Sequence, residues 1–279
     1  MSPIHSATPV SHSFSLLGPG DPPPLHSVNA EGQRPLLLVC DHAARAFPAA
    51  LGVLGVSAEA RATHIAYDIG AAEVTRHLSR LLDAPALLGG YSRLVIDLNR
   101  SETCSTLIPE ISDGVVIPGN QALDSTARRA RIEALHRPWH RAVAAELRRL
   151  HARHGVTPIL VGIHSFTPVM AGRARPWHVG VLWDGDDRLA RPLLAGLVSS
   201  GDLCVGDNQP YSARNPPGST LETHAIDSGL PGIAVEIRQD LVADDEGSTG
   251  WAERLAALLA PLTAPTLGGG GMNSASRRR

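Results

Sequence analysis

Residues that can bind a metal ion or transfer a proton follow three apolar segments of the sequence. They are the pair Asp41-His42, then His164, and finally Glu236. Two imidazoles and one carboxylate make the ligand set of many catalytic zinc sites, in which the metal lowers the pKa of water at its open position. A site of this kind can hydrolyse an amide bond, provided that a further carboxylate takes the proton of the attacking water and passes it to the leaving amine.

Glu236 suits the proton-transfer role because it comes directly after an apolar segment. Partial burial there would raise the pKa of its carboxyl group toward the useful range. For the metal ligands, spacing alone leaves the question open, since His42 belongs to neither an HExxH nor an HxxE motif. A histidine at the end of a strand more often hydrogen-bonds to the backbone or caps a helix than binds a metal.

A second polar group surrounds another apolar segment. Arg93 precedes it, and Asp97, Asn99 and Arg100 follow it. Guanidinium groups at the edge of an active site would suit bidentate recognition of a substrate carboxylate. An Arg–Asp pair that only fixes a loop explains the same residues equally well.

The elements that must position these residues follow from the apolar pattern. Short continuous apolar runs are typical of strands buried on both faces, and they occur at 35–40, 94–96, 158–163, 179–182 and 232–235. Helical patterns lie between them, at about 70–83, 125–150 with a kink or break at Pro138, 187–199 and 250–261. Alternating strands and helices predict an α/β domain with a mainly parallel or mixed sheet flanked by helices, whose ligands bind beyond the carboxyl ends of the strands.

Composition sets the limits of this domain. Residues 1–33 are rich in Ser, Pro, His and Gly, and we expect a disordered arm there, a single domain over 34–264 and a disordered tail over 265–279. The net charge of −2 gives no broad field to attract nucleic acid or anionic lipid, so we expect neither as a partner. Three widely spaced cysteines and the lack of a membrane-spanning segment favour the cytoplasm.

Five motifs resemble the N-formylglutamate amidohydrolase family, and together they cover nearly the whole predicted domain. They are Cys40-Asp41-His42-Ala43 with Pro48, and the segments 64–70 (HIAYDIG), 92–100 (SRLVIDLNR), 163–168 (IHSFTP) and 235–240 (VEIRQD). That family is similar in turn to zinc carboxypeptidases and aminoacylase-like deacylases, so the resemblance implies a phosphorylase/hydrolase-like, zinc-carboxypeptidase-like sheet.

The resemblance also implies roles for single residues. His42 and His164 would bind Zn²⁺ or another divalent metal, Glu236 would be the general base, and Asn99 with Arg100 would hold a substrate carboxylate. Carboxypeptidases place an acidic ligand three residues after the first histidine, where this chain has Arg45. We predict that Asp68 provides the acidic metal ligand in its place. The alternative is that Asp68 caps the helix that begins near Ile69.

The predicted activity is hydrolysis of N-formylglutamate or a related N-acyl amino acid to a short carboxylic acid and a free amino acid. Arg93 would stabilise the developing oxyanion, and His224, in a polar loop, could contact substrate or lie on the surface. The alternative function is a non-catalytic small-molecule binding protein with a degenerate pocket. A serine hydrolase built on Ser92 is disfavoured because the segment 90–94 lacks the second glycine of a nucleophile elbow.

Overall fold

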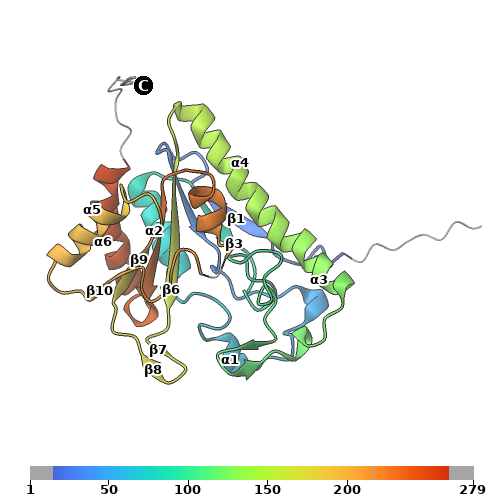
Figure 1. Cartoon of the computed structure of the whole chain (residues 1–279). Coiled ribbons are helices and arrows are strands. Elements are labelled where there is room, and N and C mark those ends of the chain that lie inside the picture. Colours follow the sequence, from blue (N-terminus) through green and yellow to red (C-terminus); the bar gives the residue numbers. More distant parts are fainter. Residues whose placement is uncertain (1–14, 216, 264–279) are drawn as a thin grey trace, which may run out of the picture.

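A seven-stranded mixed sheet forms the centre of the molecule, in the strand order β1-β3-β2-β6-β11-β9-β10 (Figure 1). The computed structural model describes residues 15–215 and 217–263. The strands are β1 Leu25–Val28, β2 Leu36–Cys40, β3 Ala86–Gly89, β6 Ile159–Phe166, β9 Val179–Leu182, β10 Val205–Asp207 and β11 Gly232–Arg238. Neighbours are parallel except at the pairs β1–β3 and β11–β9, so the predicted α/β class with a mixed sheet is confirmed.

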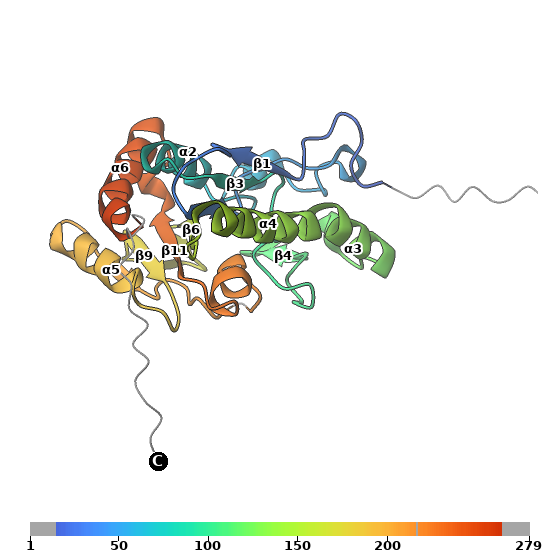
Figure 2. The ribbon, with the colours of Figure 1, turned by 90° about the horizontal axis from the view of Figure 1, so that it is seen from above.

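Helices cover both faces of the sheet, with α4 on one face and α5 and α6 on the other (Figures 1 and 2). The helices are α1 Ala58–Arg61, α2 Ala71–Leu82, α3 Ser125–Arg131, α4 Arg137–His154, α5 Ala190–Ser199 and α6 Asp245–Leu262. Short 3₁₀ turns lie at Ala49–Leu51, Pro118–Asn120 and Gln239–Leu241, and two small hairpins pair β4 Ile111–Ser112 with β5 Val115–Val116 and β7 Val169–Met170 with β8 Arg173–Ala174. Among the described residues, no helix is both long and apolar enough to cross a membrane.

Period-two alternation along the central strands decides which side chains reach the site. Leu38, Val161 and Val235 point to the face where α2, α5 and α6 pack. Val39 and Ala234 point to the opposite face, which α4 covers through Trp139, Val143, Leu147 and Leu150. Because side chains two residues apart share a face, His164 and Glu236 also lie on the α4 face, and the parallel register places them directly opposite each other.

The predicted strand at 94–96 is wrong, because Leu94 and Val95 lie in a turn and Ile96, which follows it, has no regular secondary structure. Their side chains are apolar since the turn itself is buried, with at most 1% exposure at each of the three. A buried turn needs partners for its backbone carbonyls. The Asn120 side chain donates to Leu94 O at 2.8 Å and the Arg131 guanidinium donates to Val95 O at 2.9 Å.

The predicted arm over 1–33 also needs correction in its described part. Residues 25–28 form strand β1, which pairs antiparallel with β3 at the edge of the sheet, and Leu16 is buried in the core. An edge strand with one half-exposed face carries little apolar periodicity, which explains why composition misjudged it. Residues 1–14 and 265–279, the rest of the predicted arm and the tail, lie outside the described residues.

The long predicted helix at 125–150 is present but its backbone changes pitch. A π-helical turn, Ile132–His136, joins α3 to α4 and ends two residues before Pro138. Proline cannot donate a backbone hydrogen bond and its ring crowds the preceding turn, so a widened turn there accommodates it. Asp124 caps α3 by accepting a hydrogen bond from Ala127 N at 2.8 Å.

Candidate metal-dependent active site

A cavity of about 220 Å³ opens on the α4 face of the sheet, at the carboxyl ends of β2, β6 and β11. This is the edge at which ligands of α/β sheets bind. All but one of the predicted site residues line it: His42, Asp68, Arg93, Asn99, Arg100, His164 and Glu236. The exception is His224.

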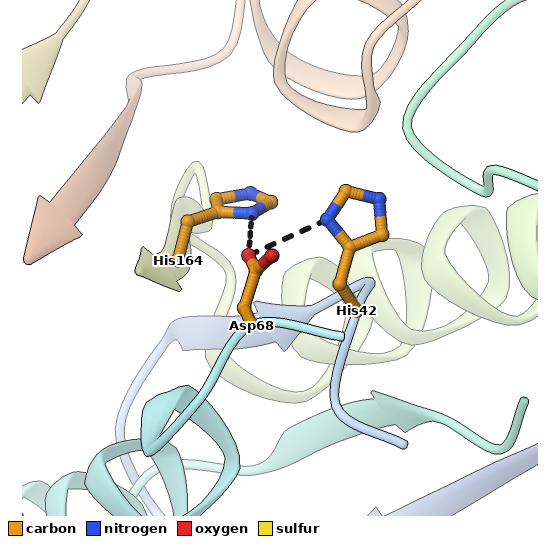
Figure 3. A group of neighbouring side chains, drawn as sticks. All are labelled: His42, Asp68 and His164. Carbon is orange, nitrogen blue, oxygen red and sulfur yellow. Dashed lines mark hydrogen bonds and ion pairs between the residues drawn. The ribbon is translucent and has the colours of Figure 1, made fainter. Parts of the chain in front are cut away.

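His42, Asp68 and His164 bring three potential metal-binding atoms within 4.8 Å of one another (Figure 3). Oδ2 of Asp68 lies 3.0 Å from Nδ1 of His164 and 3.4 Å from Nδ1 of His42. All three residues are at most 4% exposed. Separations of this size suit three ligands of one small cation, and the donor set of two imidazoles and a carboxylate suits zinc.

Asp68 reaches the histidines because its backbone is tied to the end of β2. Its amide donates to His42 O at 3.0 Å, and the N-cap of α2 is Gly70 rather than Asp68. The carboxylate of Asp68 therefore faces the two imidazoles instead of capping the helix. Arg45, at the position where carboxypeptidases have their acidic ligand, is exposed and lies over the ring of Tyr67.

Each histidine turns its other ring nitrogen toward a second aspartate. Nε2 of His42 lies 2.8 Å from Oδ1 of Asp97, and Nε2 of His164 lies 3.2 Å from Oδ2 of Asp41. A carboxylate behind a metal-binding imidazole fixes the ring orientation and increases its basicity. Both rings thus present Nδ1 toward Asp68.

The buried charges shift one another's ionisation. Burial alone would lower the pKa of His164, but contacts with Asp41 and Asp68 outweigh it and hold the pKa well above its usual value. Burial would likewise raise the pKa of Asp97, yet Arg93 and His42 hold it well below the ordinary range. The cluster is therefore a set of ionised carboxylates, which favours a cation among them.

Glu236 stands next to this cluster in a different state. Burial raises the pKa of its carboxyl group to about 7, and the nearby charge of His164 only partly opposes that rise. Its Oε2 atom is buried, and no group among the described residues hydrogen-bonds to it. A carboxyl group with a pKa near neutrality and a free oxygen can accept and return a proton.

Arg93 and Arg100 both approach Asp97 at the cavity wall. Nη2 of Arg93 lies 2.8 Å from Oδ2 of Asp97, and Nε of Arg100 lies 3.1 Å from the same oxygen. Asn99 uses its side-chain oxygen to accept the backbone hydrogen of Thr220 at 2.8 Å. The two explanations offered for these residues, a loop-fixing pair and a substrate site, therefore both have a structural basis.

Two further sequence candidates lie elsewhere. His224 is 8% exposed and its Nε2 contacts Nδ1 of His140 at 2.9 Å, outside the cavity lining. Ser92 is fully buried, and its hydroxyl donates to Ala66 O at 2.7 Å. This placement leaves Ser92 without a role as a nucleophile.

Sequence reasoning missed the polar connections behind the site. Thr220 donates its hydroxyl hydrogen to Oδ1 of Asp41 at 2.5 Å and accepts the indole hydrogen of Trp139 at 3.1 Å. For Asp41 and Asp97 the sequence did hold a signal, because both belong to the motifs described above. Asp41 directly precedes His42, and Asp97 lies between Arg93 and Arg100. The sequence around Trp139 held no such signal, because its hydrogen-bond partner Thr220 lies 81 residues away.

Comparisons with known proteins identify the family and the fold of this chain. The family model for N-formylglutamate amidohydrolase matches residues 34–243. The crystal structure of the gene product Atu2144 from Agrobacterium tumefaciens is 36% identical, with a TM-score of 0.84 over 88% of this chain and 97% of that chain. The N-formylglutamate amidohydrolase from Ralstonia eutropha JMP134 is 17% identical, with a TM-score of 0.59 over 86% of this chain and 97% of that one, a likeness of fold. No curated protein matches the sequence significantly.

Proposed function

Because the chain belongs to the N-formylglutamate amidohydrolase family, a family of hydrolases that act on amide bonds, we propose that it hydrolyses N-formylglutamate or a related N-acyl amino acid in a metal-dependent reaction. The observation that carries the proposal is the convergence of His42, Asp68 and His164 beside Glu236 in one cavity. The reaction adds water across the amide C–N bond and releases a short carboxylic acid and the free amino acid.

The donor set fits a divalent ion, and zinc is the best match to its chemistry. Nδ1 of His42, Nδ1 of His164 and the Asp68 carboxylate would hold it, with Asp97 and Asp41 supporting the two rings. When bound, such an ion supplies a Lewis acid for the amide carbonyl and lowers the pKa of water in the site.

Glu236 would move the protons. With a pKa raised to about 7, its carboxylate can accept a proton from the attacking water and return it to the amide nitrogen as the C–N bond breaks. No described residue hydrogen-bonds to its Oε2 atom, which leaves that oxygen available for this role.

Arg93, Asn99 and Arg100 would bind the charged parts of the substrate. Arg93 keeps its positive charge, since Asp97 and Asp68 outweigh the effect of burial and raise its pKa further. In our proposal it stabilises the negative charge that develops on the oxygen of the acyl group when water attacks the acyl carbon, while Asn99 and Arg100 hold the carboxylate of the amino acid.

The test measures metal content and release of free glutamate from N-formylglutamate by the purified full chain. The same sample is then stripped with a chelator and resupplied with zinc. Glutamate release that is lost on stripping and restored by zinc is the expected result. Release that continues after complete metal removal would overturn metal dependence, and zinc binding without release would shift the assay to N-acetyl and longer N-acyl amino acids.

A further inference from the structure

Three histidines gather beside the loop that carries Asn99 and Arg100, and none of them lines the cavity of the candidate site. The ring of His140 lies between the other two, with centroid distances of 4.4 Å to His136 and 5.1 Å to His224. His136 and His224 are buried, and His140 is partly buried. We refer to these three residues as the histidine cluster.

Two members of the cluster hold the backbone on either side of Asn99. Nε2 of His140 lies 3.1 Å from Leu98 O, and Nε2 of His136 lies 2.8 Å from Arg100 O. A carbonyl oxygen only accepts hydrogen bonds, so both Nε2 atoms carry the hydrogen. The carbonyls before and after Asn99 are therefore fixed by side chains from the same helical segment.

His224 completes the arrangement by fixing the state of His140. Because Nε2 of neutral His140 is the donor, its Nδ1 must be the acceptor. Nε2 of His224, 2.9 Å away, supplies that hydrogen. The direction of donation runs from His224 through His140 to Leu98 O.

Both π-helical turns of the described chain supply residues to this cluster. The first, Ile132–His136, ends at His136, and the second, Glu222–Ile226, contains His224. A π-turn inserts one residue into a helix and is often found at functional sites. Between the two, the indole of Trp139 reaches Thr220, whose amide donates to the side chain of Asn99.

We propose that His136 and His140, backed by His224, are positioning residues that hold Asn99 and Arg100 in the conformation that binds a substrate carboxylate. This inference rests on the proposed function for the identity of the ligand. A fixed backbone spares the substrate the cost of ordering the loop, so the benefit falls on binding more than on the chemical step.

His140→Leu and His140→Gln separate this role from simple packing. Leucine fills similar space without a donor, whereas the glutamine amide can still donate to Leu98 O. For an N-acyl amino acid we expect His140→Leu to raise KM about tenfold, because an unsatisfied carbonyl and a loosened loop each cost binding, with kcat changed less than about threefold. His140→Gln should recover most of the loss.

A substrate without the carboxylate provides the internal reference. For the carboxamide of the same N-acyl amino acid, kcat/KM should be the same in wild type, His140→Leu and His140→Gln. An equal loss on the carboxylate and carboxamide substrates would mean general damage and would overturn the inference. His151→Leu, an exposed position of the same helix α4, is the matched control and should change neither substrate.

A double-mutant cycle tests whether the effect passes through Arg100. In an Arg100→Gln background, His140→Leu should raise KM less than it does in the wild-type background, because the charged member of the carboxylate-binding pair is already gone. Fully additive effects of the two substitutions would overturn the inference.

Binding measured without turnover distinguishes this inference from the proposed reaction. Calorimetry of N-formylglutamate and its carboxamide on zinc-loaded Glu236→Gln protein, with and without His140→Leu, gives Kd directly. A carboxylate-specific loss of about tenfold supports the inference even if the wild-type chain hydrolyses neither compound, a result that would refute only the reaction. Equal Kd values with and without His140→Leu would overturn it.

Discussion

Oδ1 of Asp97 lies 2.8 Å from Nε2 of His42, and this contact determines which ring nitrogen faces the proposed metal site. The carboxylate can only accept, so Nε2 carries the hydrogen, and Nδ1, which faces Asp68, is the ring nitrogen left to bind a metal. The other oxygen of Asp97 contacts Arg93 at 2.8 Å. One carboxylate therefore orients both a proposed metal ligand and the proposed oxyanion-stabilising group.

Asp97→Asn should weaken zinc binding by about 10–100-fold, because the amide can still accept from Nε2 but no longer carries the charge that increases the basicity of His42. Zinc affinity is measured by competition with a chromogenic chelator. Asp202→Asn is the matched control, since Asp202 pairs with Arg254 on the surface. Unchanged zinc affinity in Asp97→Asn would show that Asp97 does not support the metal site.

Glu236→Gln should retain zinc and lose turnover by about 10²–10⁴-fold, because it removes the proton acceptor and leaves the ligand set intact. His42→Ala and His164→Ala should lose metal and activity together. Metal content by mass spectrometry and steady-state kinetics on the same preparations separate the two classes. Stoichiometric zinc retained in both histidine variants would refute the ligand assignment, and a near-normal rate in Glu236→Gln would refute the base assignment.

How far the sequence could predict this site depends on how each residue is positioned. Strands β2, β6 and β11 are buried on both faces, so continuous apolar runs predicted them from the sequence. His42, His164 and Glu236 could then be identified as polar residues at the carboxyl ends of these runs. Residues 94–96 show the limit of the same signal, because a buried turn is as apolar as a buried strand. Asp68 does not follow an apolar strand segment, so this signal could not identify it. Its position depends on the hydrogen bond from its backbone amide to His42 O.

The histidine cluster lay beyond sequence reasoning for a different reason. His140 and His224 are 84 residues apart, and a regular helical period does not bring their rings together. A π-helical turn precedes His140 and another contains His224, and neither turn has a marker in residue type. His224 was therefore recognised as a polar loop residue near the site, while its partner was not.

Gly70→Ala should destabilise the protein by about 3–5 kcal/mol, since it combines left-handed backbone strain with a steric clash. Gly70 has φ +78°, and a Cβ there would lie 1.9 Å from Val242 O. Gly155 at the end of α4 has φ +66° with nothing within 4 Å, so Gly155→Ala should cost only about 1–2 kcal/mol. Denaturant unfolding of both variants measures the difference, and equal losses would mean that the contact with Val242 O relaxes without cost.

Protonation of His140 should reduce stability in mild acid. Burial, together with His136 and His224, lowers the pKa of His140 to about 4, although Asp41 and the carbonyl of Leu98 oppose the shift. Below pH 6.5, His140 therefore binds a proton in the unfolded chain, whereas in the native state it stays neutral until the pH nears 4. The stabilisation linked to neutral His140 is complete above pH 6.5 and is lost as the pH falls from 6.5 to 4.

We expect the loss of unfolding free energy between pH 7 and pH 5 to be smaller in His140→Gln than in wild type, by on the order of 1–2 kcal/mol. His140→Leu should show the same reduced pH dependence although it is less stable at pH 7, because both substitutions remove the titrating ring. Urea unfolding at each pH measures this, and a wild-type pH dependence in both variants would show that His140 does not titrate in this range.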